Sequence, residues 1–325
     1  LGNVGAVAGK PVMEGKAVLF KLFADIDVFD IEVEAPSTEA FIETVANIAP
    51  TFGGINLEDI AAPKCFAIEE SLKERLNIPV FHDDQHGTAV VVCAGLLNAL
   101  QIQGKRLEDV RIVIQGAGSA GIATAKLLCS LGANRDHIAM VDSKGVIQIE
   151  RTDLNVYKQA FAIKTSMRTV SEAMIEADVL VGLSGPNTIT PEMIKCMTRR
   201  SIVFALSNPD PEIYPEQVKA ISDTIVVATG RSDYPNQVNN SLVFPFIFRA
   251  ALDEKISQID QQLLSDAVKC LASLAHEPVP QEVREIYTSE TLEFGPGYIL
   301  PKQFDPRLGE HMISGLKQSI QARRS

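Results

Sequence analysis

A glycine-rich turn between a short apolar run and a helical pattern constrains the fold of this chain more than any other feature. The run Val110–Ile114 is rich in β-branched residues, the turn Gly116-Ala-Gly-Ser-Ala-Gly121 follows it, and Ile122–Leu131 has helical spacing. In such a unit the first glycine permits a tight turn, the second lets a phosphate approach the backbone, and the third lets helix and strand pack closely. The helix N-terminus also attracts phosphate. We therefore predict a dinucleotide-binding βαβ unit.

A second apolar run, Ile138–Val141, ends at Asp142, where an acidic residue can accept hydrogen bonds from the adenine ribose hydroxyls. Asp142 favours NAD over NADP because it would repel a 2′-phosphate, whereas Lys144 could offset that repulsion. The pattern therefore leaves the choice between NAD and NADP open. The residues predicted to contact the dinucleotide here are Gly116, Ala117, Gly118, Ser119, Ala120, Gly121, Asp142, Ser143 and Lys144.

Three regions follow one another along the chain. Residues 1–104 mix apolar runs such as Ala17–Phe20 with Pro/Gly turns and acidic loops, residues 105–240 alternate strand-like and helical patterns, and residues 241–325 are helical up to His276 and then Pro-rich. Alternating strands and helices indicate a parallel sheet covered by helices. We predict an α/β protein in which 105–240 form a Rossmann-type doubly wound sheet domain. Residues 1–104 would form a mixed α/β substrate- and metal-binding domain, with 241–325 as a helical C-terminal return.

Composition excludes several classes of protein. The 325 residues carry a net charge of −11, which argues against a nucleic-acid or anionic-membrane surface. No run approaches the roughly 20 apolar residues of a membrane span. The first ten residues lack the features of a signal peptide, and the five dispersed cysteines form no CxxC pair. We therefore expect reduced thiols and a cytoplasmic location.

Two acidic pairs stand out in the first region, Glu58-Asp59 and Asp83-Asp84. Each follows a short apolar run, so we expect the carboxylates on a loop at a strand end. Hard cations such as Mg²⁺ and Mn²⁺ prefer carboxylate oxygens, although such pairs can also be solvated surface charge or helix caps. His82 and His86 flank the second pair without forming a helical HExxH motif, and we interpret both as outer-shell or structural groups.

At these segments the sequence resembles the malic enzyme family. The resemblance spans nearly the whole chain and includes several motifs that are specific to the family. The segments that carry it are Phe52–Asp59, Phe81–Ala89, the turn at Gly116, Ala205–Pro209, Asn239-Asn240 before Val243–Pro245, and the tail Phe294–Arg307.

The resemblance assigns roles to particular residues. It implies that Glu58, Asp59 and Asp84 bind Mg²⁺ or Mn²⁺, and that Asp83 tunes the general base. Pro11–Lys16 matches the segment that carries the family's catalytic lysine, which makes Lys16 a better candidate than Lys10. The family also uses asparagines at the edge of its dinucleotide domain. Those that match here are Asn208, for substrate and nicotinamide, and Asn239 and Asn240, for substrate.

The implied reaction is oxidative decarboxylation of malate to pyruvate and CO₂ with NAD or NADP. Lys16, with its pKa lowered by burial or a cationic neighbour, would remove the hydroxyl proton. The family's final proton donor is a tyrosine in a segment before the Leu1 stretch, and the five tyrosines of this chain lie outside the matching motif. Two alternatives therefore stay open, a dinucleotide- and metal-binding remnant without turnover and a malolactic-type enzyme. The resemblance also implies a homodimer or higher homo-oligomer.

Overall fold

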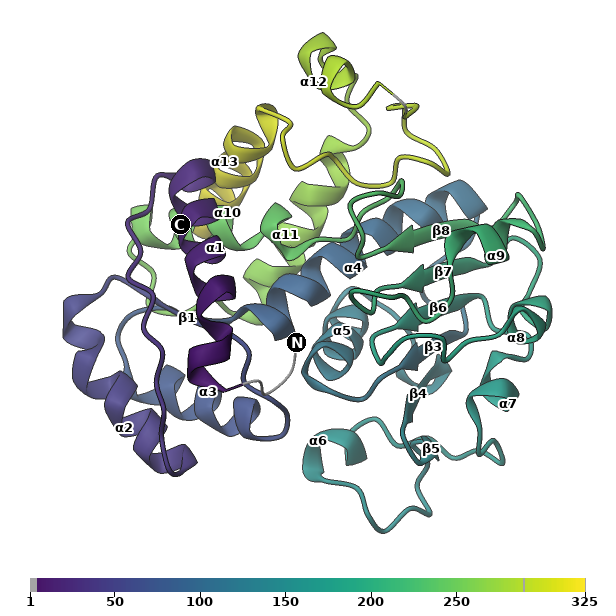
Figure 1. Cartoon of the computed structure of the whole chain (residues 1–325), viewed down its shortest axis with the longest axis horizontal. Coiled ribbons are helices and arrows are strands. Elements are labelled where there is room, and N and C mark those ends of the chain that lie inside the picture. Colours follow the sequence, from purple (N-terminus) through teal and green to yellow (C-terminus); the bar gives the residue numbers. More distant parts are fainter. Residues whose placement is uncertain (1–4, 289, 325) are drawn as a thin grey trace.

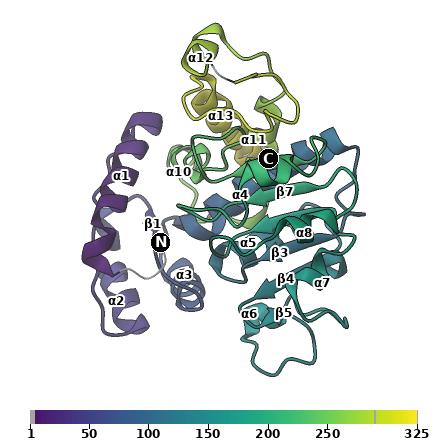
Figure 2. The same ribbon diagram turned by 45° about the vertical axis from the view of Figure 1, so that its right-hand side comes forward.

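The structure is a computed structural model that describes residues 5–288 and 290–324. A six-stranded sheet with helices on both faces forms one side of the molecule, and a helical layer with a small two-stranded sheet forms the other (Figure 1). Figure 2 shows α1 (Ala6–Ala24) and α2 (Thr38–Ile48) along the edge away from the large sheet. Among the described residues, no helix is long and apolar enough to cross a membrane.

The large sheet has the strand order β5-β4-β3-β6-β7-β8, in which only the edge strand β5 runs antiparallel to its neighbour. The prediction of a mostly parallel, doubly wound sheet is therefore confirmed. Its strands are β3 (Ile112–Gln115), β4 (Ile138–Asp142), β5 (Gly145–Val146), β6 (Val179–Gly182), β7 (Ile202–Ala205) and β8 (Val226–Thr229).

Alternation along the strands explains why helices cover both faces. Ile112 and Ile114 of β3 belong to one hydrophobic core, while Val113 between them belongs to another. Successive side chains of a strand point to opposite faces, so a run that is apolar throughout must be covered twice. The first core contains residues of α4 (Asp83–Gln103) and α5 (Ser119–Ser130). The second contains residues of α7 (Val170–Met174), α8 (Pro191–Lys195) and α9 (Pro215–Lys219).

The part of the first region that precedes α4 forms a smaller layer beside the large sheet (Figure 1). β1 (Ile55–Leu57) pairs in parallel with β2 (Val80–His82), and α3 (Lys64–Arg75) connects the two strands. The residues Ala17–Phe20, which we expected as a short apolar run, lie within α1. Ser37 caps α2 by accepting a hydrogen bond from the backbone N–H of Ala40. The remaining short elements are the 3₁₀ helices η1 (Ala49–Thr51), η2 (Arg135–His137) and η3 (Asn240–Leu242), and the helix α6 (Val156–Gln159).

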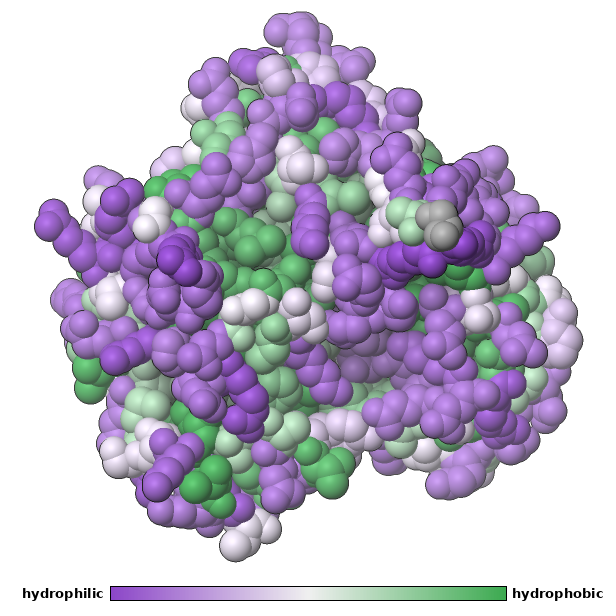
Figure 3. Space-filling view, turned by 180° about the vertical axis from the view of Figure 1, so that it is seen from behind, coloured by the Kyte–Doolittle hydropathy of each residue, from purple (hydrophilic) through white to green (hydrophobic). Residues whose placement is uncertain are grey.

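The C-terminal helices connect the two sides of the molecule. α10 (Phe244–Asp253) contacts α1, whereas α11 (Gln261–Leu274) contacts α4 and α5 next to the large sheet. α12 (Gln281–Ile286) and an irregular segment follow, and α13 (Arg307–Ala322) then packs against both α10 and α11. From behind, hydrophobic residues gather in patches among a largely hydrophilic surface (Figure 3). We predicted this helical return, but we had not predicted α13 within the Pro-rich tail.

Candidate active site

Three carboxylates from two elements meet at one point. Glu58 and Asp59 follow β1, and Asp84 lies in the first turn of α4, so the parallel pairing of β1 and β2 brings both acidic pairs to the same end. One oxygen of each of Glu58, Asp59 and Asp84 lies within 4.8 Å of the others. We had expected both pairs on loops, but Asp83 and Asp84 begin α4 because the helix starts directly after His82. Negative side chains in a first helical turn interact favourably with the helix dipole.

Lys16 of α1 points into this cluster. Its Nζ hydrogen-bonds to Oδ2 of Asp83 and lies 3.1 Å from Oε1 of Glu58. It also lies 4.5 Å from the centre of the Phe244 ring. Asn240 donates a second hydrogen bond to Oδ2 of Asp83 at 2.5 Å. Lys10, the lysine we had ranked second, pairs instead with Asp30 and Glu32 away from this cluster.

Burial and like charge make the cluster electrostatically strained. Burial, together with repulsion from Asp83, raises the pKa of Glu58 to about 9. Burial also raises the pKa of Asp83, and burial together with Asp84 raises that of Asp59. Charged carboxylates packed this closely need a compensating cation. A divalent ion fits this set of oxygen donors, although metal binding by these three residues stays a prediction.

The pKa of Lys16 differs from our expectation. Burial lowers it, but the charges of Asp83 and Glu58 outweigh burial, so the pKa is raised above the ordinary lysine value. The expected lowering was therefore wrong for the chain without ligands. We had not foreseen that two carboxylates would contact the amine, and without other ligands Lys16 is a protonated partner of Asp83.

The two histidines beside the aspartates have different surroundings. His82 is fully buried, neither ring nitrogen has a hydrogen-bond partner among the described residues, and Nε2 lies 3.9 Å from Oδ2 of Asp84. Burial lowers its pKa to about 4, so the ring is neutral near pH 7. His86 lies 2.7 Å from Oε1 of Glu69, which Lys73 also contacts. His82 ends β2 while His86 lies in α4, so the pair does not share one helix face.

The predicted asparagines surround a cavity of about 420 Å³ beside the carboxylates. Asn208 lies after β7, and Gly230 leaves room for its amide, since a Cβ at position 230 would lie 2.6 Å from Nδ2 of Asn208. Asn239 caps η3 by accepting a hydrogen bond from the N–H of Ser241 at 2.9 Å. The residues that line this cavity include Asp59, Asp84, Ser119, Ala120, Asn208, Asn239 and Asn240.

A second cavity, of about 550 Å³, lies at the carboxyl ends of β3 and β4. Gly116 has φ +117°, and a Cβ there would lie 2.2 Å from the backbone oxygen of Leu183. A Cβ at Gly121 would lie 1.8 Å from the backbone oxygen of Gly116, whereas Gly118 faces open space. These are the three properties expected of the glycines in a dinucleotide-binding turn. Among the predicted residues, Gly116, Ala117, Gly118, Asp142 and Ser143 line this cavity.

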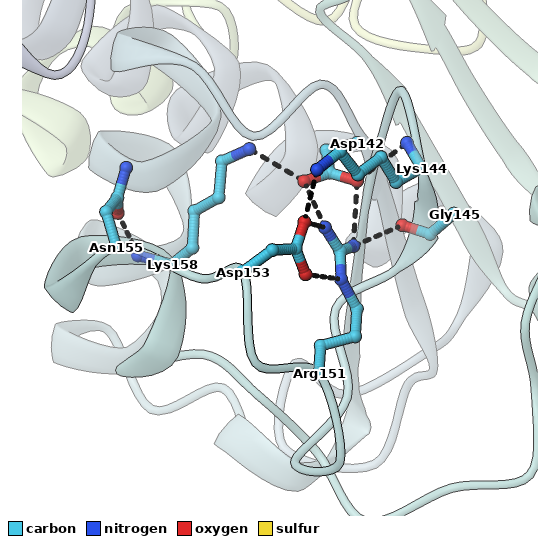
Figure 4. A network of polar contacts seen from close by, with 7 residues as sticks. All are labelled: Asp142, Lys144, Gly145, Arg151, Asp153, Asn155 and Lys158. Atoms are coloured by element: carbon cyan, nitrogen blue, oxygen red, sulfur yellow. Dashed lines mark hydrogen bonds and ion pairs between the residues drawn. The ribbon is translucent and has the colours of Figure 1, made fainter.

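Asp142 lies in a network of cations at the edge of this cavity (Figure 4). Arg151 contacts both of its carboxylate oxygens, at 2.8 and 3.0 Å, and Lys158 contacts Oδ2 at 2.7 Å. Although burial opposes it, hydrogen bonds from Arg151 and Lys158 lower the pKa of Asp142 to about 2. Lys144 contributes its backbone N–H to Asp142, whereas its amine pairs with Asp153.

We did not predict Arg151 or Lys158, which follow Asp142 by 9 and 16 residues. They lie in an irregular stretch and in a short helix, and no local pattern pointed from them back to Asp142. Glu212 was missed for the same reason. Its fully buried carboxylate accepts hydrogen bonds from the N–H groups of Ser184 and Ser207, which joins the loops after β6 and β7.

None of the described tyrosines lines the two cavities above, and none lines a third cavity, which lies next to Lys16. That cavity has a volume of about 530 Å³ and lies between α1, α2 and the segment that joins them. Tyr157 packs on Phe66, and Tyr298 is buried within the C-terminal tail.

Comparison with known proteins agrees with this arrangement. A family model described as the NAD-binding domain of malic enzyme matches residues 85–289, and one described as the N-terminal domain of malic enzyme matches residues 1–39 and 34–73. The chain is 56% identical to the NADP-dependent malic enzyme of Halomonas elongata over 98% of its own length and 76% of that protein. It is 53% identical to the NADP-dependent malic enzyme of Escherichia coli, but spans 41% of that longer protein.

Solved structures give the same result. The malic enzyme of Pyrococcus horikoshii superimposes with a TM-score of 0.89 at 41% identity, over 100% of this chain and 74% of that one. The NAD-dependent malic enzyme of Thermotoga maritima superimposes with a TM-score of 0.87 at 42% identity, over 98% and 80% of the two chains. The resemblance inferred from the motifs is therefore confirmed, and the chain belongs to the malic enzyme family.

Proposed function

We propose that this chain is the catalytic core of an enzyme that converts malate and NADP to pyruvate, CO₂ and NADPH. The observation that carries the proposal is the position of Lys16. Its amine contacts Asp83 and Glu58 within a carboxylate cluster, and Asp59 and Asp84 of that cluster also line the cavity of the three asparagines. A lysine and a carboxylate set suited to a divalent metal thus lie next to a dinucleotide-binding turn, a combination that can remove hydride from a hydroxy acid.

Glu58, Asp59 and Asp84 would hold Mg²⁺ or Mn²⁺. When bound, the ion would act as a Lewis acid toward the hydroxyl and carboxylate oxygens of malate and would relieve the repulsion that raises the pKa of Glu58. Asp83 and Asn240 hold the amine of Lys16 in place, because Asp83 accepts hydrogen bonds from both Lys16 and Asn240. The ring of His82 is neutral and its Nε2 lies 3.9 Å from Oδ2 of Asp84, so it adds no charge next to the three carboxylates.

Lys16, in its neutral form, is placed to take the hydroxyl proton of malate while hydride leaves C2 for the nicotinamide. The carboxylate charge that raises the pKa of the amine would be offset by a cation held at Glu58, which would bring that pKa down. The resulting β-keto acid then loses CO₂ and takes up one proton at carbon to give pyruvate, which balances the proton removed from the hydroxyl. Asn208 and Asn239 would bind the substrate carboxylates, since an amide donates hydrogen bonds without adding charge. Asp83 keeps the amine directed into the cluster throughout.

NADP is the cofactor that the Asp142 network supports best. A free carboxylate there would repel a 2′-phosphate, but Arg151 and Lys158 neutralise it and add positive charge at the edge of the cavity. Two of the most similar relatives, those of H. elongata and E. coli, are named as NADP-dependent. A relative from Rhizobium meliloti at 47% identity is named as NAD-dependent, so both cofactors are used within the family.

The test is a steady-state assay of the chain with malate, Mn²⁺ and either cofactor, in which pyruvate and reduced cofactor are both measured. We expect equal amounts of pyruvate and NADPH, and loss of Mn²⁺-dependent turnover in Asp84→Asn. Asp136→Asn, a change to an exposed aspartate, is the matched control and should leave the rate unchanged. Cofactor binding without product would refute the proposal, and lactate without net reduction would indicate malolactic chemistry instead.

We also propose that the chain associates with copies of itself. Val7, Val18 and Leu22 are exposed large apolar residues on α1, and Phe29 is exposed in the segment after it. Apolar residues repeated along one exposed helix favour a protein partner. Light scattering should give a mass of at least two chains, and a Leu22→Glu variant should lower it. A monomer at micromolar concentration would contradict this proposal.

A further inference from the structure

The Pro- and Gly-rich tail Phe294–Pro301 is held between two buried asparagines. Asn98 of α4 donates to the backbone oxygens of Ile299 and of Ala272, both at 2.9 Å. Asn236, in the loop between β8 and η3, accepts from the N–H of Ile299 at 3.0 Å and donates to the oxygen of Pro296 at 2.7 Å. This irregular segment therefore has its backbone groups satisfied by side chains from two other parts of the fold.

Asn236 also holds its own loop. Its Nδ2 donates to the backbone oxygen of Val227 in β8 at 2.9 Å, so the amide bonds to β8 on one side and to the tail on the other. The residue is 4% exposed and has φ +58°, a conformation that asparagine tolerates better than most residues. Two backbone bonds between Val238 and Thr229 and between Thr229 and Asn236 then close the loop against the strand end.

The same loop carries the candidate substrate residues. Asn239 and Asn240 follow Asn236 by three and four residues, and Asn240 reaches Asp83, the partner of Lys16. We propose that Asn236 is a positioning residue for malate: by joining β8 to the tail, it fixes the loop whose asparagines face the substrate. This inference rests on the proposed function, and it gives a role to the tail, which no step of that reaction uses.

The bonding pattern selects an amide at this position. Oδ1 faces an N–H group, while Nδ2 faces two carbonyl oxygens. A carboxylate would keep the bond to Ile299 but would face the oxygens of Val227 and Pro296 with no hydrogen to donate. Buried carbonyls without donors are costly, so Asn236→Asp should release the loop although it preserves size and shape.

Asn236→Gly is the principal test, because glycine adopts φ +58° without strain and removes only the side-chain bonds. We expect the KM for malate to rise and kcat/KM for malate to fall roughly 10- to 100-fold, since a shift of about 1 Å can cost about 100-fold. The KM for NADP should stay within about twofold, because this loop contributes no residue to the cavity at Gly116 and Asp142. A less stable enzyme would instead lose kcat with its folded fraction and keep both KM values.

Two controls separate the positioning role from general effects. Lys255→Gly places glycine at another positive φ, on an exposed turn after α10, and should leave all kinetic constants unchanged. Tyr298→Phe removes from the tail a buried hydroxyl that has no hydrogen-bond partner among the described residues, and it should also leave them unchanged. If Asn236→Gly does not fold, Asn236→Asp provides the same comparison.

Hydrogen exchange distinguishes failure of this inference from failure of the proposed function, because it requires no turnover. The amides of Val238 and Ile299 should exchange at least about tenfold faster in Asn236→Gly than in the wild type, while those of β3 should not change. An active wild type whose Asn236→Gly variant keeps its KM for malate would overturn the inference. Unchanged exchange at Val238 and Ile299 would overturn it even if the wild type does not turn over malate.

Discussion

Replacing Gly87 by alanine should lower the catalytic rate far more than it lowers the stability of the fold. Gly87 lies one helical turn after Asp83 in α4, and a Cβ built there would lie 1.9 Å from Oδ1 of Asp83 and 3.1 Å from the Cβ of Asn240. Ordinary carbon–oxygen contacts begin near about 3.3 Å. Gly87→Ala therefore requires the Asp83 carboxylate to move by more than about 1 Å. Asp83 is fully buried, so it cannot turn into solvent, and its movement must distort its hydrogen bonds to Lys16 and Asn240.

The expected changes in stability and in rate are of different size. Alanine is better than glycine in a helix by about 1 kcal/mol, and overpacking a core costs about 1–3 kcal/mol. The two effects partly cancel, so the free energy of unfolding should fall by about 0–2 kcal/mol. A misplacement of about 1 Å at a reacting group costs about 100-fold in rate, so kcat should fall by about that factor.

The assay is malate-dependent formation of reduced cofactor, followed together with urea unfolding of the same preparations. Gly95→Ala is the matched control, because it adds a methyl group to the same helix next to Leu300 and Phe204 and away from charged groups. Gly95→Ala should keep its kcat. A wild-type kcat in Gly87→Ala would refute the reasoning. A kcat that falls only in proportion to the fraction of folded protein would also refute it.

Two further predictions concern charge. Lys158→Ala should raise the KM for NADP roughly tenfold or more and the KM for NAD much less, because only NADP carries the 2′-phosphate. Steady-state kinetics with each cofactor measures both values. Equal effects on the two cofactors would contradict the assignment of NADP. The second prediction concerns Glu69. Burial by itself would raise the pKa of Glu69, but His86 and Lys73 lower it to about 2. The ionised form of Glu69 therefore stabilises the fold at neutral pH. That contribution, on the order of 3 kcal/mol, is complete above the unfolded pKa of about 4.3 and is lost as the pH falls toward 2. Glu69→Gln should therefore make stability less dependent on pH in this window in urea titrations, and parallel curves would disprove the coupling.

Local steric requirements could be read directly from the sequence. The turn is recognisable because Gly116 has φ +117° and a Cβ at Gly121 would meet the backbone oxygen of Gly116, so neighbouring residues carry most of the signal. The alternating strands and helices could also be predicted from the sequence, because a strand that is buried on both faces appears as a continuous run of apolar residues. The acidic pairs were visible as pairs, although only the resemblance to a family suggested which carboxylates act together.

Contacts between distant segments depended on the tertiary structure. Lys16 and Asp83 are 67 residues apart, and no local pattern shows that the carboxylates would raise the pKa of the amine. Asp142 looked like a residue that disfavours NADP until the fold placed Arg151 and Lys158 against it. Sequence alone thus determined the dinucleotide turn, the sheet and the acidic pairs, because each depends on neighbouring residues. The charge state of Lys16 and of Asp142, and the role of Asn236, were decided by the path of the chain, because electrostatic and hydrogen-bond partners act through space.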